Sequence, residues 1–128
     1  MYSRQNPSTR YRMLIEQYRN MHREGEKFLG IAPEKTFPGG KLLPQATRIK
    51  RLIERTGAKT LLDYGSGKGQ LYQRKPVEVP AVGSWPSIQA YWGLQEICCY
   101  DPCYEPFSHL PNEKFDGVIC TDVLEHCP

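Results

Sequence analysis

The chain has 128 residues, 39% of them hydrophobic and 24% charged, which suits one domain with a modest core and argues against a disordered tail. No apolar run approaches the length of a membrane-spanning helix, and the first residues lack the apolar stretch of a signal peptide, so we expect a cytoplasmic protein with no membrane partner. Residues 1–59 carry 13 Lys and Arg against 5 Asp and Glu, whereas residues 60–128 carry 4 against 9. The basic half favours solvated helix faces and leaves an anionic partner, nucleic acid included, as an alternative.

The first expected element is a helix whose start is indicated by Asn6-Pro7-Ser8-Thr9. Its apolar residues recur at helical spacing and form one stripe, and Gly25 ends the pattern. The residues of this stripe are Tyr11, Leu14, Ile15, Tyr18 and Met21.

A loop and a second helix are expected next. Residues 30–44 hold three prolines and three glycines, a composition typical of a connecting loop. Residues 44–56 predict a helix that Gly57 ends. The side of this helix that we expect in the core consists of Ala46, Ile49, Leu52 and Ile53.

Three apolar segments predict strands at residues 60–64, 97–100 and 115–122. Residues 70–72 begin a helix that prolines soon interrupt, so residues 74–93 predict a long Pro-rich loop or insertion. Helices that alternate with strands in this order indicate an α/β fold with an open parallel sheet. Within the insertion, Trp85, Tyr91 and Trp92 either form a lid over a substrate or pack the insertion itself.

The first strand runs into a glycine-rich segment, Asp63-Tyr64-Gly65-Ser66-Gly67-Lys68-Gly69. Ligands of open α/β sheets bind at such strand ends, where glycines permit positive φ and close approach. The Walker pattern fails because Lys68 is followed by Gly69 instead of Ser or Thr, and the dinucleotide pattern fails because its third glycine comes one residue early. An ordinary tight turn remains an alternative.

The spacing Asp-x-Gly-x-Gly-x-Gly resembles the first motif of class I S-adenosylmethionine (SAM)-dependent methyltransferases. Asp101 ends the second strand, where that family binds the ribose hydroxyls, and residues 114–126 resemble its fourth-strand segment, Phe-Asp-x-Val followed by Val-Leu-Glu-His. The resemblance covers residues 60–73 and 96–128. It implies a Rossmann-like sheet of the methyltransferase type, incomplete at its C-terminal end and preceded by two N-terminal helices. We therefore expect an N-terminal helical segment, 1–59, that packs on a partial SAM-binding domain, 60–128.

The resemblance also implies a role for each matching residue. The methionine part of SAM would be held by Asp63, Gly65, Ser66, Gly67 and Gly69. Asp101 would bind the ribose, with Pro102 and Cys103 against the adenine. Thr121, Asp122 and Leu124 would line the floor near the methyl group, and His126 is the candidate base for an acceptor that must lose a proton. A structural role is the alternative for each, such as a turn start at Asp101 or a core position at Leu124.

The implied function is transfer of the SAM methyl group to an unidentified nucleophile by in-line displacement. The alternatives are a non-catalytic SAM-binding module or truncated fragment, and a basic nucleic-acid-binding protein. Asp101-Pro102-Cys103-Tyr104 also resembles the Asp-Pro-Pro-Tyr motif of enzymes that methylate amino groups of nucleic acids, with a cysteine in place of the second proline.

Two spacings depart from the family. The 32 positions from Gly69 to Asp101 exceed its usual first crossover, and the 14 positions from Asp101 to Phe115 are too few for a helix and the third strand that normally contacts the adenine. The cysteines suggest buried thiols, and we expect no metal site, because the candidate ligands lack paired Cys-x-x-Cys spacing. Those candidates are Cys98, Cys99, Cys103, His109, His126 and Cys127.

Overall fold

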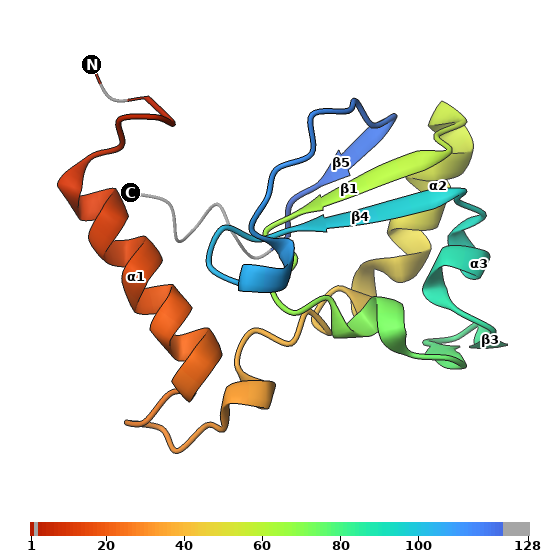
Figure 1. The fold of residues 1–128 in the computed structure, drawn as a ribbon. Coiled ribbons are helices and arrows are strands. Elements are labelled where there is room, and N and C mark those ends of the chain that lie inside the picture. The colour runs from red at the N-terminus through yellow and green to blue at the C-terminus, as the bar shows by residue number, and fades with distance from the viewer. Residues whose placement is uncertain (2, 122–128) are drawn as a thin grey trace.

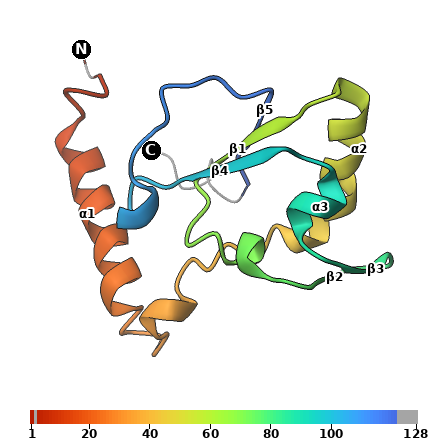
Figure 2. The same ribbon diagram turned by 45° about the vertical axis from the view of Figure 1, so that its right-hand side comes forward.

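A computed structural model describes residue 1 and residues 3–121 of the chain. The first helix, α1 (Thr9–Glu24), begins and ends as the sequence predicts. The Ser8 hydroxyl accepts a hydrogen bond from the Tyr11 amide at 3.1 Å, and Gly25, with φ of 83°, donates to the Met21 carbonyl at the other end. In Figures 1 and 2, α1 lies beyond the carboxyl ends of the strands, which together form the carboxyl edge of the sheet.

The second helix, α2 (Ala46–Thr56), follows two short 3₁₀ turns, η1 (Pro33–Lys35) and η2 (Leu43–Gln45), and ends at Gly57 with φ of 70°. Its buried residues are Ala46, Ile49 and Ile53. The prediction that Leu52 belongs to the core is wrong, because its side chain is 50% exposed. At 3.6 residues per turn Leu52 lies on the flank of the stripe that the other three form.

The main sheet has three parallel strands in the order β4 (Glu96–Tyr100), β1 (Thr60–Tyr64) and β5 (Gly117–Ile119). The predicted mixed α/β class with a parallel sheet is confirmed, and β1 has the bounds that the sequence predicts (Figure 1). β5 is shorter than predicted, since Cys120 and Thr121 continue without strand pairing among the described residues. Because β4 and β5 both follow β1 in the chain and pair with it on opposite sides, the chain reverses its direction across the sheet there.

Asp116 ties the amino ends of β1 and β5 together. Its carboxylate accepts hydrogen bonds from the amides of Lys59 (2.8 Å) and Thr60 (3.2 Å), and its own amide donates to the Thr60 hydroxyl at 2.9 Å. The bond from Lys59, then that from Thr60, lowers the pKa of the Asp116 carboxyl. These contacts fix the register in which Leu61 pairs with Gly117.

The crossover from β1 to β4 is more regular than the Pro-rich composition predicts. A 3₁₀ turn, η3 (Gln70–Gln73), leads to an antiparallel hairpin of β2 (Val77–Val79) and β3 (Gly83–Trp85), and then to the short helix α3 (Ile88–Trp92). Of the two predicted alternatives, a loop or an insertion, residues 74–93 thus form a segment that contains its own hairpin and short helix. Prolines 76, 80 and 86 lie between these elements, where they remove no hydrogen bond from a helix or strand.

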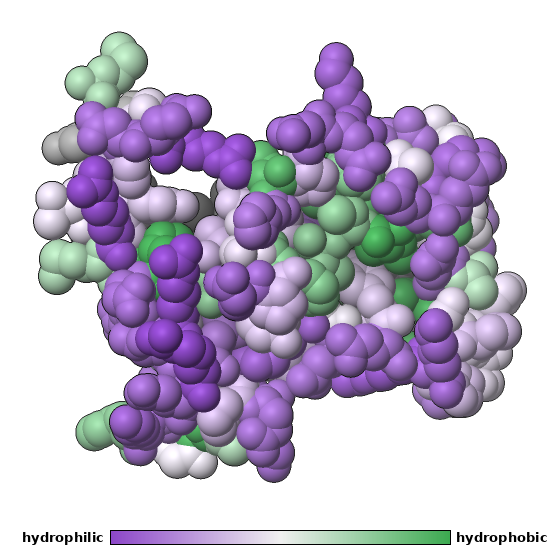
Figure 3. Space-filling view, viewed as in Figure 1, coloured by the Kyte–Doolittle hydropathy of each residue, from purple (hydrophilic) through white to green (hydrophobic). Residues whose placement is uncertain are grey.

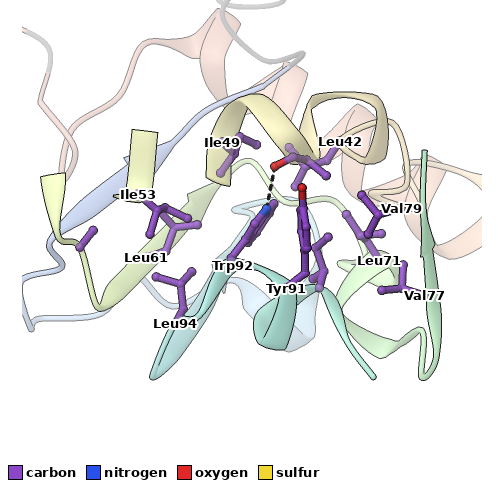
Figure 4. Packing of buried hydrophobic residues seen from close by; sticks show 13 residues of the cluster. Leu42, Ile49, Ile53, Leu61, Leu71, Val77, Val79, Tyr91, Trp92 and Leu94 are labelled. Carbon is purple, nitrogen blue, oxygen red and sulfur yellow. Dashed lines mark hydrogen bonds between the residues drawn. The ribbon is translucent and has the colours of Figure 1, made fainter. Parts of the chain in front are cut away.

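The hydrophobic core lies between one face of the sheet, α2 and this crossover (Figure 4). Trp92 is 2% exposed and Tyr91 3%, and the Trp92 indole donates to the Ala46 carbonyl at 2.9 Å. These two aromatic residues pack the core and do not form a lid. The buried cluster consists of Leu42, Ala46, Ile49, Ile53, Ala58, Leu61, Leu71, Val77, Val79, Ile88, Tyr91, Trp92 and Leu94.

The opposite face of the sheet, turned toward the viewer in Figure 1, carries none of the described helices. Hydrophobic surface is visible over this region in Figure 3, and Val118 on β5 is 61% exposed. Within residues 1 and 3–121, no helix is both long and apolar enough to cross a bilayer.

Candidate functional site

The glycine-rich segment forms a turn at the carboxyl end of β1, and its glycines need their conformational freedom. Gly65, Gly67 and Gly69 have φ of 80°, 58° and 60°. A Cβ at Gly67 would lie 2.3 Å from the Phe37 carbonyl oxygen. On the other side of the contact, a Cβ at Gly39 would lie 2.6 Å from the Ser66 carbonyl oxygen. Residues 36–40 of the chain itself therefore pack against the turn in the space that these glycines leave open.

Every backbone amide from Gly65 to Gln70 donates to an acceptor within the protein. Gly65 and Ser66 donate to the Tyr100 carbonyl at 2.7 and 3.1 Å. The remaining four amides, of Gly67, Lys68, Gly69 and Gln70, donate to the Asp101 carboxylate and to the carbonyls of Phe37, Ser66 and Pro38, at 2.8 to 3.2 Å. The turn therefore offers a ligand only acceptors, its carbonyl oxygens, and no amide donors.

Asp101 joins the exit of β4 to the glycine turn. Its carboxylate accepts from the Gly67 amide and from the Cys103 amide, both at 2.9 Å. The second bond makes Asp101 the first residue of a local turn, which is the structural role left open by the sequence. Each carboxylate oxygen keeps a second lone pair, so a ribose contact remains a prediction.

Asp63 is 4% exposed and lies under the turn. The Tyr72 hydroxyl donates to it at 2.6 Å. Burial raises the pKa of Asp63 to about 6, and the hydrogen bond from Tyr72 acts in the opposite direction. The glycine turn is thus built over a carboxyl group that titrates near neutrality.

Lys68 is 8% exposed and has all its donors used. Its ammonium group contacts three acceptors: the Thr36 carbonyl at 2.5 Å, the Thr36 hydroxyl at 3.1 Å and His22 Nδ1 at 2.8 Å. Because an ammonium group only donates, His22 Nδ1 accepts and its proton is on Nε2. Burial, followed by the nearby Lys68 charge, lowers the pKa of His22 to about 4. Burial also lowers the pKa of Lys68.

This ammonium group joins three separate parts of the chain: α1 through His22, the segment after η1 through Thr36, and the glycine turn. Tyr104 completes the cluster, with its ring stacked on His22 at 5.0 Å and 5.4 Å from the Lys68 ammonium group. Helix α1 is therefore fixed to the carboxyl edge of the sheet by buried polar contacts.

The described cysteines, Cys98, Cys99, Cys103 and Cys120, form no disulfide. Burial raises the pKa of Cys99 and of Cys103 to about 12, so both remain protonated thiols near neutral pH. Within the part of the chain that the structure describes, no three His, Cys, Asp or Glu residues are grouped to hold a metal ion.

Two cavities lie near the carboxyl edge, and the expected SAM residues divide between them. A cavity of about 140 Å³ between α1 and the loop after β4 includes Cys103 in its wall. A groove of about 600 Å³ between α2 and the end of β5 includes Thr121. No residue of the glycine turn lines either of these two cavities, and Pro102 contributes its carbonyl to Arg19 Nε at 3.4 Å.

The structure thus brings the glycine turn and Asp101 together but leaves Cys103 and Thr121 in separate cavities. Asp122, Leu124 and His126 lie outside the described residues. Sequence reasoning did not identify His22, Thr36, Lys68 or Tyr72 as parts of this site. The adjacent Gly39 and Gly40 are a signal of close backbone approach, but no local pattern marks His22, which lies 46 residues from Lys68.

Comparison with protein-family models, with curated proteins and with solved structures finds no match for this chain. The geometry of the carboxyl edge is therefore the basis for a proposed function.

Proposed function

We propose that the chain is the cofactor-binding part of a class I SAM-dependent methyltransferase with a Rossmann-like sheet. The observation that carries the proposal is the order β4-β1-β5 together with the hydrogen bond of 2.9 Å between Gly67 and Asp101. This order places the glycine turn at the point where the sheet changes its direction of winding, and ligands of open α/β sheets bind there. Two segments that resemble separate methyltransferase motifs are in direct contact at that point.

The chemistry of the turn favours a cationic ligand over a phosphate. Phosphate-binding turns present free backbone amides to the ligand. Four amides of this turn, those of Gly65, Ser66, Gly67 and Gly69, donate to acceptors outside residues 36–40. Carbonyl oxygens and the carboxylate of Asp101 suit the ammonium and sulfonium groups of SAM. These four occupied amides count against the dinucleotide alternative independently of the glycine spacing.

Cofactor binding at the turn requires residues 36–40 to move. Ser66, Gly67 and Gly69 are buried, and the Lys68 and Gln70 amides donate to the Phe37 and Pro38 carbonyls. We expect SAM to change the hydrogen exchange of these two amides more than that of amides in α2. SAM supplies an activated methyl group, and the chain supplies alignment and exclusion of water, with His126 the candidate base to replace first.

The direct test is calorimetric titration with SAM, S-adenosylhomocysteine and NAD⁺. We expect both sulfur ligands to bind with dissociation constants below about 1 mM and NAD⁺ to give no heat. Absence of heat with SAM and S-adenosylhomocysteine would contradict the proposal and leave the nucleic-acid-binding alternative. Binding without methyl transfer to any acceptor tried would support the non-catalytic module.

A matched pair of variants tests the role of Asp101. Asp101 and Asp116 each accept hydrogen bonds from two backbone amides, but at opposite ends of the sheet. We expect Asp101→Asn to weaken SAM binding about tenfold, as loss of a charge-assisted hydrogen bond does, and Asp116→Asn to leave it unchanged. Equal affinities in the two variants would remove Asp101 from the binding site.

A further inference from the structure

The groove between α2 and β5 is the larger of the two cavities described above. One of its walls is a single face of α2, formed by Arg48, Ile49 and Leu52, whose spacing of three and four residues aligns them along the helix, with Gln45 of η2 directly before it. Lys41 extends this wall, and Ile119, Cys120 and Thr121 form the other side, where the chain leaves β5. Its volume of about 600 Å³ is within the range of small-molecule sites.

The lining of the groove combines an aliphatic floor with positive charge. Ile49, Leu52 and Ile119 supply the aliphatic surface, and Leu52 is 50% exposed. Lys41 and Arg48 are both exposed and line the groove, and among the described residues 1 and 3–121 no acidic side chain lines it. The exposed position of Leu52 thus belongs to a formed groove beside two cationic side chains.

This lining selects a class of ligand. The described lining residues include no aromatic side chain, so they provide no stacking surface for a nucleic-acid base. An arginine beside aliphatic surface matches a carboxylate or phosphate group attached to a small apolar body. We propose that the groove binds a small organic anion of this kind. This further step depends on the proposed function. If that function is correct, the anion is the methyl acceptor, because Thr121, which the methyltransferase resemblance assigns to the floor near the methyl group, lines the groove.

Titration of the ¹⁵N-labelled chain with phenyl phosphate, monitored by NMR, tests this proposal. Inorganic phosphate and phenol, the two halves of the probe, are titrated separately for comparison. We expect phenyl phosphate to bind at least about tenfold more tightly than either half, with shifts in residues 45–52 and 119–121. Absence of saturable shifts with phenyl phosphate up to about 10 mM would overturn the proposal. Tight binding of inorganic phosphate alone would overturn the part assigned to the aliphatic floor.

Two arginines on the same helix provide the variant and its control. Arg48 lines the groove, whereas Arg51, also exposed and three residues further along α2, does not. We expect Arg48→Gln to weaken phenyl phosphate binding about fivefold to tenfold and Arg51→Gln to change it less than twofold. Equal losses in the two variants would indicate general attraction to a basic surface and would overturn the site.

The same titrations separate this inference from the proposed function. Phenyl phosphate is added without SAM, so groove binding in a chain that does not bind SAM would support the groove and reject the methyltransferase. Conversely, a chain that binds SAM and gives no shifts with phenyl phosphate would retain the proposed function and lose this inference.

Discussion

The two sides of the glycine turn are held together in different ways. Beneath it, α2, the crossover and one face of the sheet enclose a cluster of apolar side chains. In and around the turn, the carboxyl edge contains the buried polar and charged residues that the structure describes: His22, Thr36, Asp63, Ser66 and Lys68. Apolar packing is proportional to buried area and tolerates exchange of similar side chains, whereas a buried polar network is stable only when each member has its partner. The core therefore provides most of the stability, and the edge fixes one arrangement of α1 and residues 36–40.

The largest expected effect is in the core. Trp92→Ala removes a side chain that is 2% exposed together with its hydrogen bond to Ala46, and we expect a loss of about 3–5 kcal/mol in the free energy of unfolding. Trp85→Ala, at a half-buried residue of the same crossover, should cost about 1–2 kcal/mol. Urea denaturation followed by circular dichroism measures both. Similar losses for the two tryptophans would contradict the assignment of Trp92 to the core.

The next effect tests whether residues 36–40 pack on the turn. Gly67→Ala meets both an unfavourable φ of 58° and the Phe37 carbonyl oxygen, so we expect a loss of about 2–4 kcal/mol. Gly57→Ala is the matched control: its φ is 70° but nothing lies within 4 Å of the added Cβ, so only the backbone cost of about 1 kcal/mol remains. Equal losses for Gly67→Ala and Gly57→Ala in urea denaturation would show that residues 36–40 do not contact the turn.

The pH dependence of stability distinguishes the edge from the core. The pKa of His22 falls to about 4 on folding, so its contribution to stability increases as pH rises from about 4 to about 6.5. The pKa of Asp63 rises to about 6, so its contribution decreases as pH rises from about 4 to about 6. The two slopes oppose each other in the wild-type chain, and we expect a nearly flat profile from this pair.

Single variants should show separately how His22 and Asp63 each change the free energy of unfolding with pH. With Asp63→Asn, stability should rise by on the order of 2 kcal/mol between pH 4 and pH 6.5, and with His22→Gln it should fall by a similar amount. Denaturation curves measured across this range provide the check, with Asp116→Asn as a variant outside the cluster. Unchanged profiles in both single variants would show that neither group is perturbed by folding.

The smallest expected effect is a conservative change within the edge. Tyr72→Phe removes the hydroxyl that donates to Asp63 at 2.6 Å and keeps the ring that packs against Trp92. We expect a loss of about 1–2 kcal/mol at neutral pH, where the Asp63 carboxylate then lacks this donor, and a smaller loss below pH 5. A loss that does not vary with pH would mean that the contribution of the hydroxyl does not depend on the charge of Asp63.

The elements that the sequence predicted well are those defined by local signals. Ser8, Gly25 and Gly57 mark helix ends through hydrogen bonds and backbone angles formed within one turn, so α1 and the end of α2 were predictable. The hairpin in residues 77–85 was missed because β2 and β3 have only three residues each, too few for alternation to be recognised.

The candidate site was predictable in its position but not in its contacts. The glycines and Asp101 were identified from their strand ends, and they do lie together. Lys68 appeared only as the lysine of a Walker pattern that Gly69 breaks, and its partners Thr36 and His22 are 32 and 46 residues away. No local spacing encodes such pairs, because they depend on how α1 and residues 36–40 return to the sheet.

The Asp116 contacts at the amino ends of β1 and β5 have a consequence for synthesis on the ribosome. β1 is the central strand, yet both of its neighbours are made after it: Glu96 pairs with Thr60 across 36 positions, and Asp116 reaches Thr60 across 56. An emerging chain therefore carries β1 without a strand partner until β4 has been translated, and the final register is fixed only after residue 116. During that interval α2 has already been made, and its apolar face can shield Leu61.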